Sequence, residues 1–86
     1  MRFHGAADAY GWYRSRRYVL RHPNAMPRQL YQAGPAADTA IALVDLERLL
    51  GRLGRAGRKA LRERGSGYAE ASAHFETLLR EASYLH

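Results

Sequence analysis

The sequence predicts an all-α fold, a small bundle of about four helices in one domain over residues 1–86. Apolar residues recur with spacings of three and four along two long stretches, which is typical of amphipathic helices. No strand-like alternation exceeds four residues, and Pro or Gly marks most of the candidate boundaries. A chain of this length buries roughly 60% of its unfolded surface, so one modest core is expected.

The first helix is predicted over residues 6–21. His22-Pro23 ends it, because the residue before a proline is pushed out of the helical region. Residues 22–35, with three prolines and a glycine, are predicted to form a linker. Trp12 lies on one side of the first helix and is expected in the core. Arginines and tyrosines share the other side, namely Tyr10, Arg14, Arg17, Tyr18 and Arg21.

The second helix is predicted over residues 36–53, with Asp38 as a good N-cap. One side of it is apolar, which predicts a core face, and this stripe comprises Ala42, Leu46, Leu49, Leu50 and Leu53. Gly51, Gly54 and Gly57 then occupy every third position. They either break the helix or form a flexible joint.

A third helix is predicted over residues 55–64 and a fourth over residues 68–85, separated by Gly65-Ser66-Gly67, in which Ser66 is a candidate helix cap. The fourth helix carries the longest apolar stripe, made of Tyr68, Ala71, Phe75, Leu78, Leu79, Ala82 and Leu85. Both long stripes predict core packing. A homodimer through helix 68–85 or helix 36–53 is the alternative use of either stripe.

Charge is segregated along the chain. The segments 1–34, 35–50, 51–65 and 66–86 carry net charges of +5, −2, +5 and −2, counting Lys, Arg, Asp and Glu. Of the 14 basic residues, 13 are Arg, whose planar fork suits phosphate and carboxylate contacts. Segregated positive charge concentrates a positive potential on part of the surface and therefore points to a polyanionic partner.

The second positive segment forms one basic face when it is drawn as a helix, made of Arg52, Arg55, Arg58, Lys59 and Arg62. Like charges on one face repel each other, and a polyanion relieves that cost. We predict that this face, assisted by Arg14, Arg17 and Arg21, contacts nucleic-acid phosphate, with double-stranded DNA as the expected form. A solvated face without a ligand is the plainer interpretation.

The order of segments resembles small phage transcription regulators, of the RinA and ArpU types, whose C-terminal part is like region 4 of bacterial sigma factors. The similar stretches are AYGWYRSRRYVLRHP, GPAADTAIALVDLERLLGRL and GRAGRKALRERGSGYAEASAHF. The resemblance implies a phage or prophage DNA-binding protein that regulates transcription through a helix-turn-helix. Residues 68–85, however, contain no Gly, Pro, Asn or Asp, so we predict one continuous helix there. A turn near His74–Phe75 is the alternative, and it would aim Thr77, Arg80, Glu81 and Tyr84 at a major groove.

The sequence lacks the residues that several classes of function require. The absence of Cys excludes disulfides and thiolate metal sites, and the four histidines show no metal-ligand spacing. No nucleophile motif surrounds Ser66, and His74 is expected to be structural, so we expect no catalytic residues, no cofactor and no metal. No apolar run approaches the roughly 20 residues of a membrane span. A cytoplasmic location is therefore expected, in the host cell if a phage encodes the chain.

Two functions are the main candidates, and a structural role as a helical assembly or packaging component is a third. The first is a small basic regulator that binds DNA phosphates. The second is a helical interaction module, an adaptor or inhibitor that docks onto an acidic protein surface, such as host RNA polymerase or a defence complex of the CRISPR effector kind. Arg is also common at protein interfaces. Ile41 and Val44, which lie off the apolar stripe of helix 36–53, are candidate contact residues for this second function.

Overall fold

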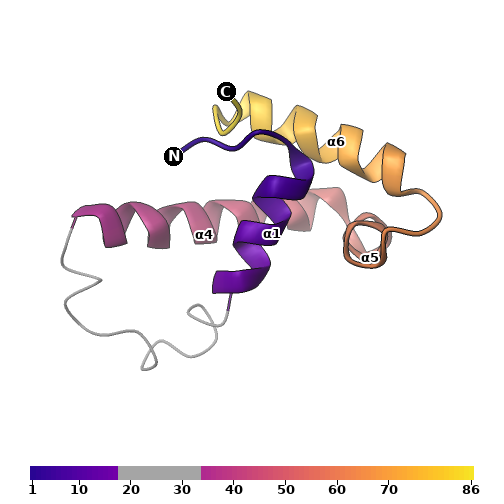
Figure 1. Ribbon diagram of the computed structural model, residues 1–86, viewed down its shortest axis with the longest axis horizontal. Coiled ribbons are helices and arrows are strands. Elements are labelled where there is room, and N and C mark those ends of the chain that lie inside the picture. Colours follow the sequence, from indigo (N-terminus) through magenta and orange to yellow (C-terminus); the bar gives the residue numbers. More distant parts are fainter. Residues whose placement is uncertain (18–33) are drawn as a thin grey trace.

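The computed structural model describes residues 1–17 and 34–86, and it confirms the predicted all-α fold (Figure 1). The four helices of the described residues are α1 (Ala6–Arg16), α4 (Gly34–Leu53), α5 (Arg55–Glu63) and α6 (Tyr68–Glu81). No strand is present in these residues. An isolated parallel bridge between Phe3 and Leu85 brings the two ends of the chain together.

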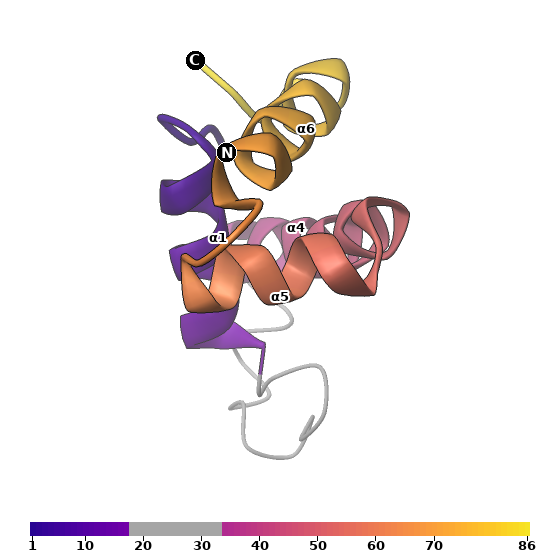
Figure 2. The same ribbon diagram turned by 90° about the vertical axis from the view of Figure 1, so that its right-hand side faces the viewer.

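The helices form a crossed arrangement in which α6 is central. It packs against all three of the other described helices. In Figure 1, α6 lies above α4 while α1 crosses α4. The same view shows α5 along its axis, and Figure 2, turned by 90°, shows it lengthwise below α6. Thus α5 runs across one end of the α4 and α6 pair.

The core is built from the predicted apolar stripes. The largest fully buried side chains come only from α4 and α6, and they are Leu43, Leu46, Leu49, Leu50, Phe75 and Leu79. Leu43 was missing from the predicted stripe, although it precedes Leu50 by two turns and therefore lies on the same side of α4. From α1, Tyr13 is buried, whereas Trp12 packs at the edge of the core against the ring of Phe3, with centroids 5.4 Å apart.

The end of the fourth helix was predicted wrongly. Helix α6 ends at Glu81, not at residue 85, because Ser83 adopts a left-handed conformation with φ 64°. The backbone N–H of Tyr84 then donates to the carbonyl of Leu79 at 2.8 Å, and that of Ser83 donates to Arg80 at 3.0 Å. These two bonds form a Schellman cap, which turns Leu85 away from the helix and toward Phe3.

Other boundaries also differ from the prediction. Helix α1 ends at Arg16, so of the predicted residues 6–21 Arg17 lies in a turn and residues 18–21 lie outside the described part. Helix α4 begins at Gly34, which removes the last two residues from the predicted linker and puts Asp38 inside the helix rather than at its N-cap. Gly67, and not Ser66, is the N-cap of α6, and no side chain caps that helix.

The corner between α4 and α5 depends on two of the three glycines. Gly54, with φ 93°, breaks the helix between Leu53 and Arg55, while Gly51 lies inside α4. Gly57 lies inside α5 against Leu53, where an added Cβ would be 2.6 Å from the Leu53 Cγ atom. The missing side chain at Gly57 therefore lets the first turn of α5 fold back closely on the end of α4.

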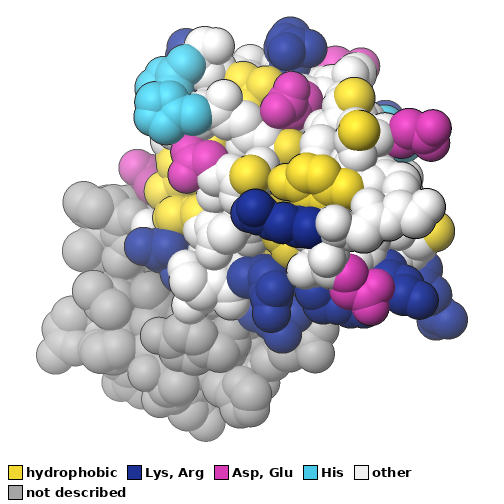
Figure 3. All heavy atoms as spheres, turned by 45° about the vertical axis from the view of Figure 1, so that its right-hand side comes forward, with side chains coloured by type: hydrophobic (Ala, Val, Ile, Leu, Met, Phe, Trp, Pro, Cys, Tyr) yellow, Lys and Arg dark blue, Asp and Glu magenta, His cyan; other side chains and the backbone are white. Residues whose placement is uncertain are grey.

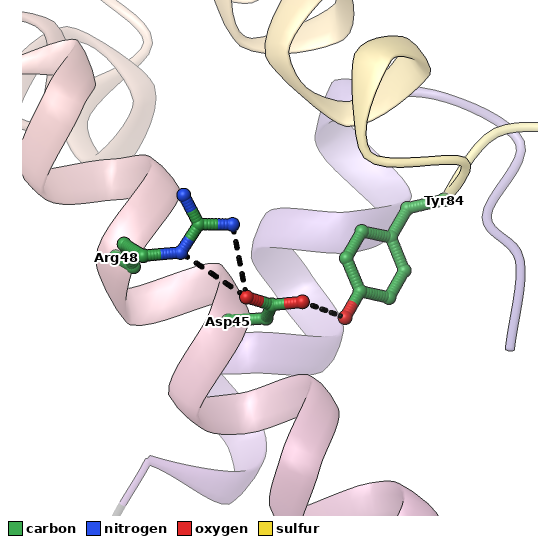
Figure 4. A network of polar contacts seen from close by, with 3 residues as sticks. All are labelled: Asp45, Arg48 and Tyr84. Carbon is green, nitrogen blue, oxygen red and sulfur yellow. Dashed lines mark hydrogen bonds and ion pairs between the residues drawn. The ribbon is translucent and has the colours of Figure 1, made fainter.

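Polar contacts connect α4 to both ends of the chain. The Tyr84 hydroxyl donates to Asp45 Oδ2 at 2.7 Å, and the Arg48 guanidinium donates to Asp45 Oδ1 at 3.0 Å (Figure 4). These donors, Tyr84 first, hold the pKa of Asp45 below its ordinary value. Burial, and then the bond to Asp45, raise the pKa of Tyr84 to about 12. Two residues further along α4, Glu47 accepts a hydrogen bond from the Tyr13 hydroxyl of α1.

Candidate nucleic-acid interface

A groove lined by positive charge lies between α1 and α5. Its volume is about 490 Å³. We call it the basic groove, and its lining residues are Tyr10, Tyr13, Arg17, Leu50, Arg55, Arg58, Lys59 and Arg62. Five of these eight residues are Lys or Arg, so the groove combines cations from α5 and from the turn after α1.

The spacing of the α5 cations explains why they share this groove. Arg55, Arg58, Lys59 and Arg62 are separated by three, one and three residues, which places them on one side of an α-helix. Ala60 and Leu61 are buried and fix α5 to the core. The sequence therefore predicted this part of the basic face correctly. Figure 3 shows Lys and Arg side chains gathered over the lower part of the described surface.

Few carboxylates neutralise the basic groove. Glu63 lies 4.0 Å from Arg62, measured from carboxylate oxygen to guanidinium nitrogen. No carboxylate of the described residues comes within ion-pair distance of Arg17, Arg55, Arg58 or Lys59, and residues 18–33 contain no Asp or Glu in their sequence. Four of the five groove cations therefore lack a charged partner within the chain, and the positive potential stays concentrated there.

A second hollow continues the basic surface on the other side of Arg62. Its volume is about 110 Å³. We call it the side hollow, and it is lined by Ala7, Tyr10, Gly11, Arg14, Leu61, Arg62, Arg64 and Tyr68. Tyr10 and Arg62 border both cavities, so the two cavities form one continuous positive surface.

The predicted site residues fall into four groups. Arg17, Arg55, Arg58, Lys59 and Arg62 line the basic groove, and Arg14 lines the side hollow. Arg52 is exposed and lines neither cavity. The reason is the helix break at Gly54, which ends the rotation of α4 before Arg55 begins a new helix. Arg21 lies outside the described residues.

The prediction of this surface from the sequence missed three of its residues, Arg64, Tyr68 and Tyr13. Arg64 has a left-handed backbone with φ 53°, and its guanidinium lies over the ring of Tyr68 at 5.7 Å from the centroid. Tyr13 enters the basic groove from the buried side of α1. A weak signal existed for Arg64, because it directly precedes Gly65 at the predicted end of a helix, where left-handed residues are common.

The structure decides between the two predictions for residues 68–85. Helix α6 passes through His74 and Phe75 without interruption, so the alternative with a turn at this point is wrong. Thr77 is exposed but its hydroxyl donates to the carbonyl of Ala73, and Tyr84 is bonded to Asp45. His74 is exposed. The exposed charged residues of α6 are Glu70, Arg80 and Glu81, so its outer face is not a basic surface.

The described residues hold no group of three or more His, Asp or Glu side chains placed to bind a metal ion. None of their helices is long and apolar enough to cross a membrane. Comparison of the chain with protein-family models, with curated proteins and with solved structures finds no match.

Proposed function

We propose that this protein binds nucleic acid through phosphate contacts in the basic groove. The observation that carries the proposal is the groove itself, in which four of five cations have no carboxylate partner. The planar guanidinium of Arg can donate two parallel hydrogen bonds to phosphate oxygens, and each phosphate that is neutralised releases counterions. Such binding is driven by the gain in counterion entropy and needs no particular base sequence.

We favour a role in the control of transcription on DNA, because the sequence resembles phage regulators with a sigma-like C-terminal part. In this proposal α5 supplies the contacts, whereas the α6 face with Glu70, Arg80 and Glu81 supplies little base readout. Affinity is therefore expected to depend strongly on salt and weakly on sequence. With about five phosphates neutralised, the log–log slope on duplex DNA is expected near −4.5.

The test is fluorescence anisotropy with a labelled 20-base-pair duplex over a salt series. The double variant Arg55→Glu/Arg62→Glu is expected to lose binding and to keep its helical circular dichroism, because both side chains are exposed. The matched control is Arg52→Glu/Arg80→Glu, which makes the same change in net charge outside the basic groove. Equal losses in the two variants, or a flat salt dependence of the unchanged protein, would contradict the proposal.

A second candidate is a protein-interaction module that docks on an acidic protein surface. It is favoured by two apolar side chains of α4, Ile41 and Val44, which are 63% and 60% exposed. They lie beside the Asp45–Arg48 ion pair. RNA polymerase and CRISPR effector complexes are the acidic or nucleic-acid-handling targets proposed for it. No anisotropy change on any nucleic acid, together with capture of one protein that Ile41→Glu/Val44→Glu abolishes, would favour this candidate.

Homodimer formation stays a proposal for α4 only. The apolar stripe of α6 is already used within the chain, since Phe75, Leu78 and Leu79 are all buried. A dimer through α4 would use the same Ile41 and Val44 side chains, because the apolar stripe of α4 faces the core. Light scattering of the protein with and without Ile41→Glu/Val44→Glu tests it.

A further inference from the structure

The side hollow differs in kind from the basic groove. It is smaller, and it is bordered by two tyrosine rings and three arginines, namely Tyr10, Tyr68, Arg14, Arg62 and Arg64. Its volume of about 110 Å³ is comparable to a cavity of about 150 Å³ that holds one benzene ring. The side hollow is open to solvent, so a six-membered ring would lodge in it only in part.

An exposed glycine of α1, Gly11, is among the residues that line the side hollow. Ala7, Tyr10, Gly11 and Arg14 share one side of α1, and no atom lies within 4 Å of a Cβ built on Gly11. Any larger side chain at this position would project into the hollow. Gly11 lies inside α1, where glycine is less favourable than alanine, so the helix itself does not require it.

The aromatic rings at the hollow are partly exposed and already engaged with flat groups. Tyr10 stacks on Tyr13 with an interplanar angle of 25° and a centroid distance of 6.4 Å. Arg64 lies over Tyr68, and it does so from a left-handed backbone that costs energy for a residue with a Cβ. Tyrosine rings and guanidinium planes of this kind are the surfaces on which unpaired bases stack.

We propose that the side hollow receives one unpaired base of a single-stranded nucleic acid, between Tyr10 and Tyr68, while the neighbouring phosphates lie in the basic groove. The inference rests on the proposed function and names its substrate class. A base in a duplex is held in its stack and cannot enter the hollow without unpairing. Single strands therefore gain a contact that duplexes lack, and pyrimidines fit the hollow better than purines.

The predicted consequence is a preference for single strands. Stacking of one base on aromatic side chains is expected to make a 20-nucleotide oligothymidylate bind about tenfold more tightly than a duplex of 20 base pairs at equal salt. An oligoadenylate of the same length is expected to fall between the two. Anisotropy titrations of the full chain with the three labelled probes measure these affinities.

Two variants test whether the side hollow causes the preference. Gly11→Leu fills the hollow and is expected to lower oligothymidylate affinity about tenfold while leaving duplex affinity unchanged. Gly51→Leu is the matched control, because Gly51 is also an exposed glycine within a helix, with no atom within 4 Å of an added Cβ. Tyr68→Leu, which removes one ring, is expected to act in the same direction and keeps the test decisive if Gly11→Leu fails to fold.

The outcomes separate this inference from the proposed function. Equal affinity for oligothymidylate and duplex would overturn the base-binding inference and leave phosphate binding in the groove intact. Equal losses on both probes in Gly11→Leu would also overturn it, since the hollow would then take a phosphate, which both probes share. Absence of binding to every probe at low salt would overturn both proposals together.

Discussion

Replacing Gly by Ala should stabilise the folded state at position 51 and destabilise it at position 57. In an ordinary helix, replacing Gly by Ala stabilises the folded state by about 0.5–1 kcal/mol, because the unfolded chain loses conformational freedom. Gly51→Ala places its new Cβ in open space and should gain this amount. Gly57→Ala places its Cβ 2.6 Å from the Leu53 Cγ atom, a distance that real Cβ contacts do not reach.

At position 57 the free-energy cost of the steric overlap exceeds the gain from the reduced freedom of the unfolded chain. Relieving the overlap requires Leu53, which is packed against the core, to change its rotamer or α5 to move away from α4. Overpacking of this kind costs about 1–3 kcal/mol, so the net effect of Gly57→Ala is a loss of about 1 kcal/mol. For a domain of this size a loss of 1 kcal/mol lowers the melting temperature by about 4–8 °C.

Thermal and urea unfolding, followed by far-ultraviolet circular dichroism, give the free energies of the variants. A double-mutant cycle with Leu53→Ala identifies the cause, because that change removes the atoms that Gly57→Ala would overlap. In the Leu53→Ala background, Gly57→Ala should become stabilising, as Gly51→Ala is in the unchanged protein. If Gly57→Ala stabilises the unchanged protein as much as Gly51→Ala does, the close packing of the α4–α5 corner is refuted.

The remaining predictions concern the end of α6. Ser83→Gly should stabilise the fold by about 1 kcal/mol in urea unfolding, because Gly adopts the left-handed conformation of this position without steric cost; no change would argue against the Schellman cap. Tyr84 keeps its proton in the folded state up to about pH 12, whereas unfolded tyrosine loses it near pH 10. Stability should therefore fall as the pH rises between these values, and Tyr84→Phe should reduce that fall while costing about 1 kcal/mol at pH 7. The lowered pKa of Asp45 acts in the opposite pH range: it stabilises the folded state at neutral pH, and this stabilisation is lost as the pH falls through the folded-state pKa. Asp45→Asn should therefore flatten acid unfolding curves.

The sequence predicted the helices more accurately than their ends. The stripes of α4 and α6 follow from apolar spacing, which is a local property, and most of their residues are buried as expected. Leu53, Tyr68, Ala82 and Leu85 are partly buried against the core. The end of α6 could not be predicted in this way, because a serine and not a glycine takes the left-handed position at residue 83. The gain that compensates for its strain is the pairing of Leu85 with Phe3, and this contact joins residues at opposite ends of the chain.

The sequence could predict which cations of α5 share one face, but it could not predict the shape of the cavities that they line. The face of α5 depends on spacing within nine residues, and the groove confirms it. Arg52 lines neither cavity, because the backbone of Gly54 interrupts the single helical rotation that grouped it with the α5 cations. The tyrosines of the side hollow come from α1 and α6, so only the packing of distant segments brings Tyr10 and Tyr68 to one cavity.

The positive surface arises from the placement of the acidic residues as much as from the number of arginines. Glu47 accepts from the hydroxyl of Tyr13, and Glu76 accepts from the backbone N–H of Ala6 at the start of α1. Both donors are neutral, so these carboxylates stabilise the contacts of α1 without neutralising any Arg. Helix α5 meanwhile keeps its cations together, although they repel one another, because Ala60 and Leu61 attach it to the core. Glu47 and Glu76 are thus used in contacts between helices, and four of the five cations of the basic groove stay without a carboxylate partner among the described residues.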